Sequence, residues 1–301
     1  MKLDPVSLSC FLSTVEEGTI AHAAAREHIV PSAISKRIAE LEEVLQTKLL
    51  TRTNKGVEPT TAGLALVTLA RGLLHDIDDV VAQMRDHARG MRGHIRVVAN
   101  ISAITQRLPG DIKSFLAQYP EVAIRLAEMT SGPITRAVAD NDADVGVFVE
   151  GLHADGIETF PYHSDELIVI TPKQHPLARR RSLSFVETLP FDYVGLHTGS
   201  AINAQLVKMA STANMTLRLR IQVTSYSALC LMVEAGLGIG ILPSLSARPY
   251  VDTLRIRAIP LDEPWRRRQL LIGVRSYPSL STAAKLFVDH LLRRPAAADG
   301  P

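Results

Sequence analysis

Three polar residues in the stretch PSAISKRIAELEEVL, residues 31–45, have the types and spacing of a hydrogen-bonding surface. Ser35 and Lys36 follow Ser32 by three and four positions, so a helix would bring all three to one broad face. Hydroxyl and ammonium groups of this kind can bond to the base edges and phosphates of a nucleic acid. That chemistry requires a helix that keeps these side chains out of the protein core.

The sequence around them predicts such a helix, beginning at Pro31. Proline is tolerated at the first helical position because its missing N–H would have no intrahelical partner. Ile34, Ile38, Leu41 and Leu45 fall on one stripe, which predicts a buried aliphatic face opposite the polar one. Near its N-terminus the exposed face is small, hydroxylic and basic, whereas acidic residues follow later. This asymmetry favours insertion of the N-terminal end into the major groove of DNA.

Neighbouring elements complete a DNA-binding unit over residues 1–61. Helices are expected over residues 3–17 and 20–27, the first ended by Gly18 and the second capped by Thr19. Strands at 49–50 and 57–60 would form a hairpin wing with basic residues at its tip. Seven Lys or Arg and eight Asp or Glu give this region a net charge of −1, so the placement of charge, and not its total, would attract DNA.

One long helical pattern follows, over residues 62–91. Apolar residues recur at alternating steps of four and three, which is the seam of a coiled coil. Such a helix cannot bury its seam alone, so a second copy of the chain is its expected cover. The seam residues are Leu66, Ala70, Leu73, Ile77, Val80 and Met84.

Residues 92–301 alternate between strand and helix patterns, which predicts parallel sheets with right-handed crossovers. Two rounds of the pattern suggest two lobes with a cleft, lobe 1 over about 92–162 plus 265–295 and lobe 2 over about 163–264. The expected strands are 94–100, 122–129, 144–149, 166–171, 191–196, 217–223, 238–243 and 268–274. The expected helices are 104–118, 133–140, 201–213, 226–235 and 280–292.

Hydroxyl groups follow several of these strands, at the edge where ligands bind in parallel sheets. Ser102, Thr130 and Ser200 are the candidate ligand contacts, with Phe148 and Ile202 as possible walls. Helix N-termini converging on one cleft favour an anion, usually a carboxylate. The alternative is that these residues are only caps and turn formers.

Taken in order, these motifs resemble the LysR-type transcriptional regulators along the whole chain. The family's expected fold is a winged helix-turn-helix, a linker helix and an α/β two-lobed domain like a periplasmic binding protein. The residues that carry the resemblance are Phe11, Gly18-Thr19, Ala23-Ala24, Ser32-Ala33-Ile34-Ser35, Ile38, Leu41-Glu42, Leu49-Leu50, Arg52, Thr60 and Ala62-Gly63.

The resemblance implies roles for particular residues. Ser32, Ser35 and Lys36 would approach base edges, while phosphates would be held by Arg52, Lys55 and Thr60. Arg37 is a further predicted contact, although the helical wheel puts it at the border of the buried stripe. The alternatives are that Ser32 only caps the helix and that the lysine and arginine charges are merely solvated.

The sequence departs from the usual family pattern at Glu27, where leucine is common, and at Val30-Pro31, where Ser-Gln is common. This sequence has Leu50 where the family usually has phenylalanine, and Pro59 where most members have leucine. Glutamine at the position of Pro31 often contacts a base, so the preferred DNA sequence should differ from that of other members.

The implied partners are double-stranded DNA, a small carboxylate effector, further copies of the chain as a dimer or tetramer, and RNA polymerase. An enzyme is not expected: His197 lies near Ser200, but no nucleophile elbow or orienting acid accompanies them. No metal is expected, because no cluster of metal-ligating residues appears. No dinucleotide cofactor is expected, because the glycines at 236, 238 and 240 lack the dinucleotide-binding pattern. A solute-binding protein without a regulatory role is the alternative, but it would leave residues 1–61 unexplained and would need a secretion signal. Cys10 and Cys230 are expected to be reduced core thiols, and the protein cytoplasmic.

Overall fold

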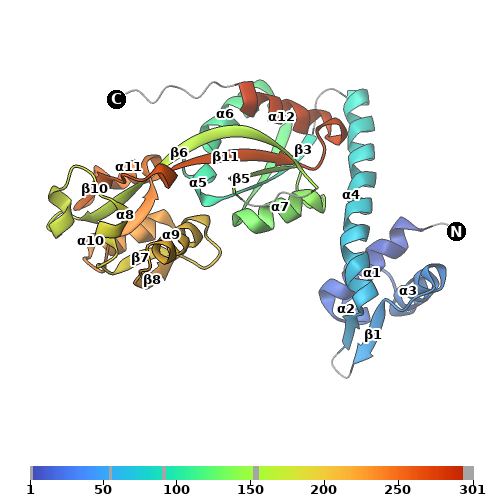
Figure 1. Cartoon of the computed structure of the whole chain (residues 1–301). Coiled ribbons are helices and arrows are strands. Elements are labelled where there is room, and N and C mark those ends of the chain that lie inside the picture. Colours follow the sequence, from blue (N-terminus) through green and yellow to red (C-terminus); the bar gives the residue numbers. More distant parts are fainter. Residues whose placement is uncertain (1–2, 54–55, 90–92, 152–155, 294–301) are drawn as a thin grey trace. The chain divides into compact units, whose positions relative to one another are not determined.

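The computed structural model describes residues 3–53, 56–89, 93–151 and 156–293. Residues 1–90, with 140–142, form one compact unit, and the rest of the chain forms a second (Figure 1). Each unit has its own hydrophobic core. Among the described residues, no helix combines the length and apolarity that crossing a membrane requires.

The first unit begins with three helices, α1 (Pro5–Glu17), α2 (Ile20–Arg26) and α3 (Pro31–Leu45), which confirms the expected elements to within two residues. Local signals set their ends. The Asp4 carboxylate accepts from the N–H groups of Val6 and Ser7, and Gly18 ends α1 with a left-handed φ of 69°. The Thr19 hydroxyl then caps α2. The core beneath them holds Leu8, Cys10, Phe11, Ala24, Ile34, Ile38 and Leu41.

The wing is the antiparallel pair β1 (Leu50–Thr53) and β2 (Gly56–Pro59). It leads into the 29-residue helix α4 (Thr61–Arg89). The predicted seam of α4 is only partly exposed, because Ala70 is buried and Leu66 packs against the core of the same unit. From Leu73 onward its residues Ile77, Val80 and Met84 are exposed.

The Glu42 carboxylate joins α3 to the start of the wing. Its Oε1 accepts from the N–H of Leu49 at 2.9 Å and of Leu50 at 3.2 Å, and its Oε2 accepts from Lys48 Nζ at 2.6 Å. Burial acts to raise the pKa of Glu42, but these donors outweigh it and hold the pKa below its ordinary value. The ionised carboxylate therefore stabilises the folded unit.

This stabilisation should disappear in acid. A lowered folded pKa contributes stability above the ordinary glutamate pKa of about 4.3, and the contribution is lost as pH falls through the lower folded value. We expect Glu42→Gln to speed hydrogen exchange of the Leu49 and Leu50 amides at pH 6, by an amount equivalent to about 1–3 kcal/mol. The difference from the wild type should shrink toward pH 3. Glu43→Gln, which removes an exposed charge next to it, serves as the control; a difference that stays constant with pH would contradict this role.

The second unit is built on a seven-stranded sheet in the order β10-β6-β11-β5-β3-β4, with β9 also paired to β6. A separate parallel pair is formed by β7 (Tyr193–Leu196) and β8 (Leu219–Val223). The strands of the large sheet are β3 (Gly93–Ala99), β4 (Val122–Glu128), β5 (Val145–Val149), β6 (Glu158–Pro172), β9 (Gly240–Pro243), β10 (Ile256–Pro260) and β11 (Arg267–Val274).

The expectation of purely parallel sheets is wrong. β3 is parallel to β4 and β5, but β6 is antiparallel to β9, β10 and β11, and β11 is antiparallel to β5. The cause is β6, whose 15 residues extend well beyond the predicted 166–171 and pair with strands on both sides. Strand β10 and helix α11 (Ser244–Val251) lie where the sequence predicted no element.

Two hydrophobic cores lie on this framework, and β6 contributes to both. One core contains side chains of residues 95–162 and 270–291, and the other contains side chains of residues 167–261. The long strands β6 and β11 run side by side between them. The helices are α5 (Ile101–Ile104), α6 (Leu108–Gln118), α7 (Ser131–Ala139), α8 (Phe185–Thr188), α9 (Ala201–Thr212), α10 (Tyr226–Glu234), α11 and α12 (Thr282–Arg293).

Candidate functional site

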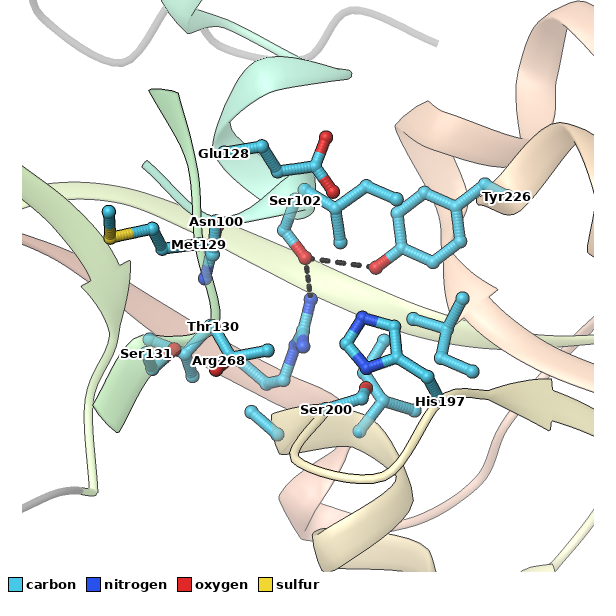
Figure 2. A pocket seen from close by; sticks show the side chains of 15 residues that line it. Asn100, Ser102, Glu128, Met129, Thr130, Ser131, His197, Ser200, Tyr226 and Arg268 are labelled. Carbon is cyan, nitrogen blue, oxygen red and sulfur yellow. Dashed lines mark hydrogen bonds between the residues drawn. The ribbon is translucent and has the colours of Figure 1, made fainter. Parts of the chain in front are cut away.

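A cavity of about 230 Å³ lies between the two cores of the second unit (Figure 2). Strand ends and helix starts form it, because β3 and β4 lead into α5 and α7, and β7 leads into α9. Five of the side chains at these junctions are short and polar, namely Asn100, Ser102, Thr130, Ser131 and Ser200. Its lining residues are Asn100, Ile101, Ser102, Glu128, Met129, Thr130, Ser131, Val149, Leu196, His197, Ser200, Ala201, Ile202, Tyr226 and Arg268.

Four of the five predicted ligand contacts line this cavity, namely Ser102, Thr130, Ser200 and Ile202. The prediction that Phe148 lines the cavity is wrong. Its side chain is buried in a separate cluster with Ile134 and Val138. Successive residues of a strand point to opposite faces of the sheet. The neighbouring Val149 therefore lines the cavity instead.

A buried ion pair that the sequence did not reveal stands at one wall. Arg268 of β11 lies opposite Asp165 of β6, and its Nε donates to Asp165 Oδ1 at 2.8 Å. A second bond joins Nη2 to Oδ2, and the Asp165 side chain is 0% exposed. The same Nη2 donates to Ser102 Oγ at 3.2 Å (Figure 2).

The pair connects to a bond between the two cores. Ser102 Oγ of α5 lies 3.0 Å from the hydroxyl of Tyr226, at the start of α10. Burial raises the pKa of Tyr226 to about 12, so its hydroxyl stays protonated at neutral pH. A second such bond joins Thr105 Oγ1 to Ser246 Oγ at 2.8 Å. The cavity wall is therefore a polar contact between the two halves of the unit.

In the first unit, α3 presents the predicted polar face. Ser32 and Lys36 are exposed, and Lys36 Nζ lies 3.8 Å from Glu40. Ser32 is not the N-cap: that position is Val30, whose side chain makes no capping bond. The interpretation of Ser32 as a simple cap is therefore wrong, and its hydroxyl stays on the exposed face. Ser35 is half-buried at the edge of this face.

Two other predicted DNA contacts are engaged within the protein. Arg37 Nη1 forms an ion pair with Asp4 at 2.8 Å, which joins α3 to the cap of α1. Thr60 Oγ1 donates to the Lys48 carbonyl at 2.8 Å and accepts from the Gly63 N–H at 3.0 Å, as the cap of α4. Arg52 lies in β1. Lys55 lies outside the described residues.

The departure at Glu27 has a structural reason. Its carboxylate accepts from the hydroxyl of Ser9 at 3.2 Å and from that of Ser13, both on α1. Two serines therefore replace the apolar contact that a leucine would make at this position. Hydrogen bonds therefore hold α1 to the end of α2 at this point.

A helix-turn-helix unit and a two-core unit with a polar cavity, on one chain, define a regulator with a ligand-binding domain. Two family models match: "Bacterial regulatory helix-turn-helix protein, lysR family" over residues 6–64 and "LysR substrate binding domain" over residues 88–296. The chain belongs to the LysR family of transcriptional regulators. This is a family of regulators, not of enzymes.

Curated relatives cover nearly the whole chain. An uncharacterized regulator of Escherichia coli K12, YbhD, is 29% identical over 95% of this chain and 90% of its own length. The nitrogen assimilation regulatory protein nac of the same organism is 25% identical over 95% of this chain and 93% of its own length.

Solved structures share the fold. Full-length CbnR in complex with its target DNA has a TM-score of 0.72 at 21% identity, covering 97% of this chain and 99% of CbnR. The effector-binding domain of QuiR with shikimate has a TM-score of 0.61 at 19% identity, covering 67% of this chain and 97% of that domain.

Proposed function

We propose that this regulator binds a specific DNA sequence through α3 and responds to a small carboxylate held in the cavity. The observation that carries the DNA-binding part is the exposed face of α3, where Ser32 and Lys36 stand beside an N-terminus without a side-chain cap. Free N–H groups at a helix N-terminus favour phosphate, and lysine can donate to guanine O6 and N7. Because two other predicted contacts are engaged internally, we assign base reading to Ser32, Ser35 and Lys36.

In this proposal each part of the chain has one role. Residues 1–61 bind DNA, residues 62–91 join two copies through the exposed part of α4, and residues 92–301 bind the effector. The exposed Leu73, Ile77, Val80 and Met84 support the joining role, since a second copy would cover them. Two dimers would form a tetramer in the cytoplasm. The effector acts by preferring one arrangement of the copies, which changes DNA bending or contact with RNA polymerase.

The cavity supports a carboxylate through neutral donors. Helix α9 starts at its wall, and the Ser200 side chain at its N-cap makes no capping bond. The N-terminus of α7 reaches the same cavity at Thr130 and Ser131. Two uncapped or hydroxyl-lined helix starts give a carboxylate several N–H and O–H donors at once.

The DNA-binding part is tested by replacing Lys36. We expect Lys36→Ala to weaken binding to the intergenic DNA upstream of the protein's own gene by about 10- to 100-fold, since a good base contact is worth about 1–3 kcal/mol. The measurement is fluorescence anisotropy, titrated with salt. If Lys36 also neutralises a phosphate, the slope of log K against log salt should fall by about 1.

The matched control is Arg26→Ala, which removes the same charge from α2, where the guanidinium is held by Glu16 at 2.8 Å. It should change DNA affinity much less than Lys36→Ala. Equal losses in the two variants would show that only the overall charge matters and would contradict base reading by α3.

A further inference from the structure

The cavity contains a guanidinium whose charge is already compensated. Arg268 has its charge balanced by Asp165, which receives two of its N–H groups and is fully buried. The His197 Nδ1 lies 3.0 Å from the Thr198 carbonyl oxygen, so this ring nitrogen is engaged within its own loop. A ligand carboxylate therefore meets hydrogen-bond donors here, and the guanidinium beside them is already paired.

An unpaired negative charge stands at the mouth of the same cavity. Glu128, the last residue of β4, lines the cavity and is exposed, and its carboxylate makes no hydrogen bond or ion pair within the described part of the chain (Figure 2). A second carboxylate on the ligand would face this charge. An ammonium group would instead be attracted to it.

Buried side chains with unused hydrogen-bonding capacity line the other parts of the cavity. Asn100 is 6% exposed, and its Oδ1 caps α5, whereas its Nδ2 bonds to no residue that the structure describes. The Ser131 and Ser200 side chains are 3% and 7% exposed, and neither hydroxyl bonds to another described residue. Since these three residues line the cavity, their unused donors are open to a polar ligand that enters it.

We propose that the effector is a zwitterionic amino acid. Its carboxylate lies against Asn100, Ser131 and Ser200 and the starts of α7 and α9, and its ammonium group lies against Glu128. Dicarboxylates are disfavoured because their second charge would face the carboxylate of Glu128. This inference rests on the proposed function in one respect, that the cavity is the effector site.

The test is isothermal titration calorimetry of the full chain with three classes of probe. The probes are the twenty amino acids, the 2-hydroxy acids with the same carbon skeletons, and the short dicarboxylates oxalate, malonate and succinate. At least one amino acid should bind ten-fold or more tightly than its hydroxy counterpart. In Glu128→Gln that preference should fall to two-fold or less, while the affinity for the hydroxy acid stays within two-fold of wild type.

Two further variants make the result specific. Glu150→Gln removes an exposed charge that follows β5 but does not line the cavity, and it should leave every affinity unchanged. Ser200→Ala should weaken the amino acid and its hydroxy counterpart by the same factor, because it acts on the shared carboxylate. A selective effect on one of them would contradict the proposed orientation.

Tighter binding of a dicarboxylate or a simple hydroxy acid would overturn the proposal of a zwitterionic ligand. The proposal would also fall if Glu128→Gln kept the wild-type preference for the amino acid over its hydroxy counterpart. If such a ligand also altered DNA affinity, the proposed function would stand and only the ligand class would fall. If no probe bound and none altered DNA affinity, both the ligand class and the carboxylate-sensing role would fall.

Discussion

Gly63→Ala should lower the melting temperature of the DNA-binding unit by about 12–24 °C. A Cβ at this position would lie 2.1 Å from the Leu49 carbonyl oxygen and 3.2 Å from Pro59 Cβ. The Leu49 carbonyl cannot move away freely, because it accepts from the Thr60 N–H at 2.9 Å and its side chain is buried. Overpacking against such a site costs about 3 kcal/mol, and in a unit of this size each kcal/mol shifts the melting temperature by about 4–8 °C.

The matched control is Gly72→Ala in the same helix. Its added Cβ would have no neighbour closer than 3.7 Å, and alanine favours a helix over glycine by about 1 kcal/mol. Calorimetric scans should therefore show opposite shifts for the two variants. A Gly63→Ala protein as stable as the wild type would mean that α4 can separate from the wing without loss.

Arg268→Ala should destabilise the second unit by about 3–5 kcal/mol, the usual result of leaving one member of a buried ion pair alone. Among the described residues, Asp165 would keep the bond from Gln106 Nε2, at 3.0 Å, while remaining fully buried. Urea unfolding can be followed by fluorescence of Trp265, the one tryptophan of the chain, which packs edge-on against Phe185 in this unit.

Arg267→Ala provides the comparison for this loss. The neighbouring arginine also pairs with an acid, Glu166, at 2.7 Å, but its side chain is 75% exposed. An exposed pair contributes about 0–1 kcal/mol, so this variant should unfold close to the wild type. Similar losses of unfolding free energy in both variants would show that burial does not increase the contribution of the Arg268 pair to stability.

Changes at the cavity should also affect the contact between the two cores. Ser102 bonds both to Arg268 and to Tyr226, so its oxygen is shared between the ion pair and the opposite half of the unit. A ligand that binds Ser102 competes with these bonds. By this competition, we expect a ligand at the proposed site to prefer one arrangement of the halves over another.

The sequence by itself determined the first unit almost completely. The ends of α1 and the start of α2 depend on Asp4, Gly18 and Thr19, which act on N–H and C=O groups a few residues away. The exposed face of α3 follows from the spacing of Ile34 and Ile38. Such signals are local, so they can be read without knowing the fold.

Tertiary structure alone decided the chemistry of the cavity wall. Arg268 and Asp165 are 103 residues apart, and only the antiparallel register of β11 with β6 places them together. The same pairing made the sheet mixed, and the alternation of side chains along β5 placed Val149 in the cavity and Phe148 outside it. Strand direction and register depend on partners far away in the chain, so no local pattern of residues specifies them.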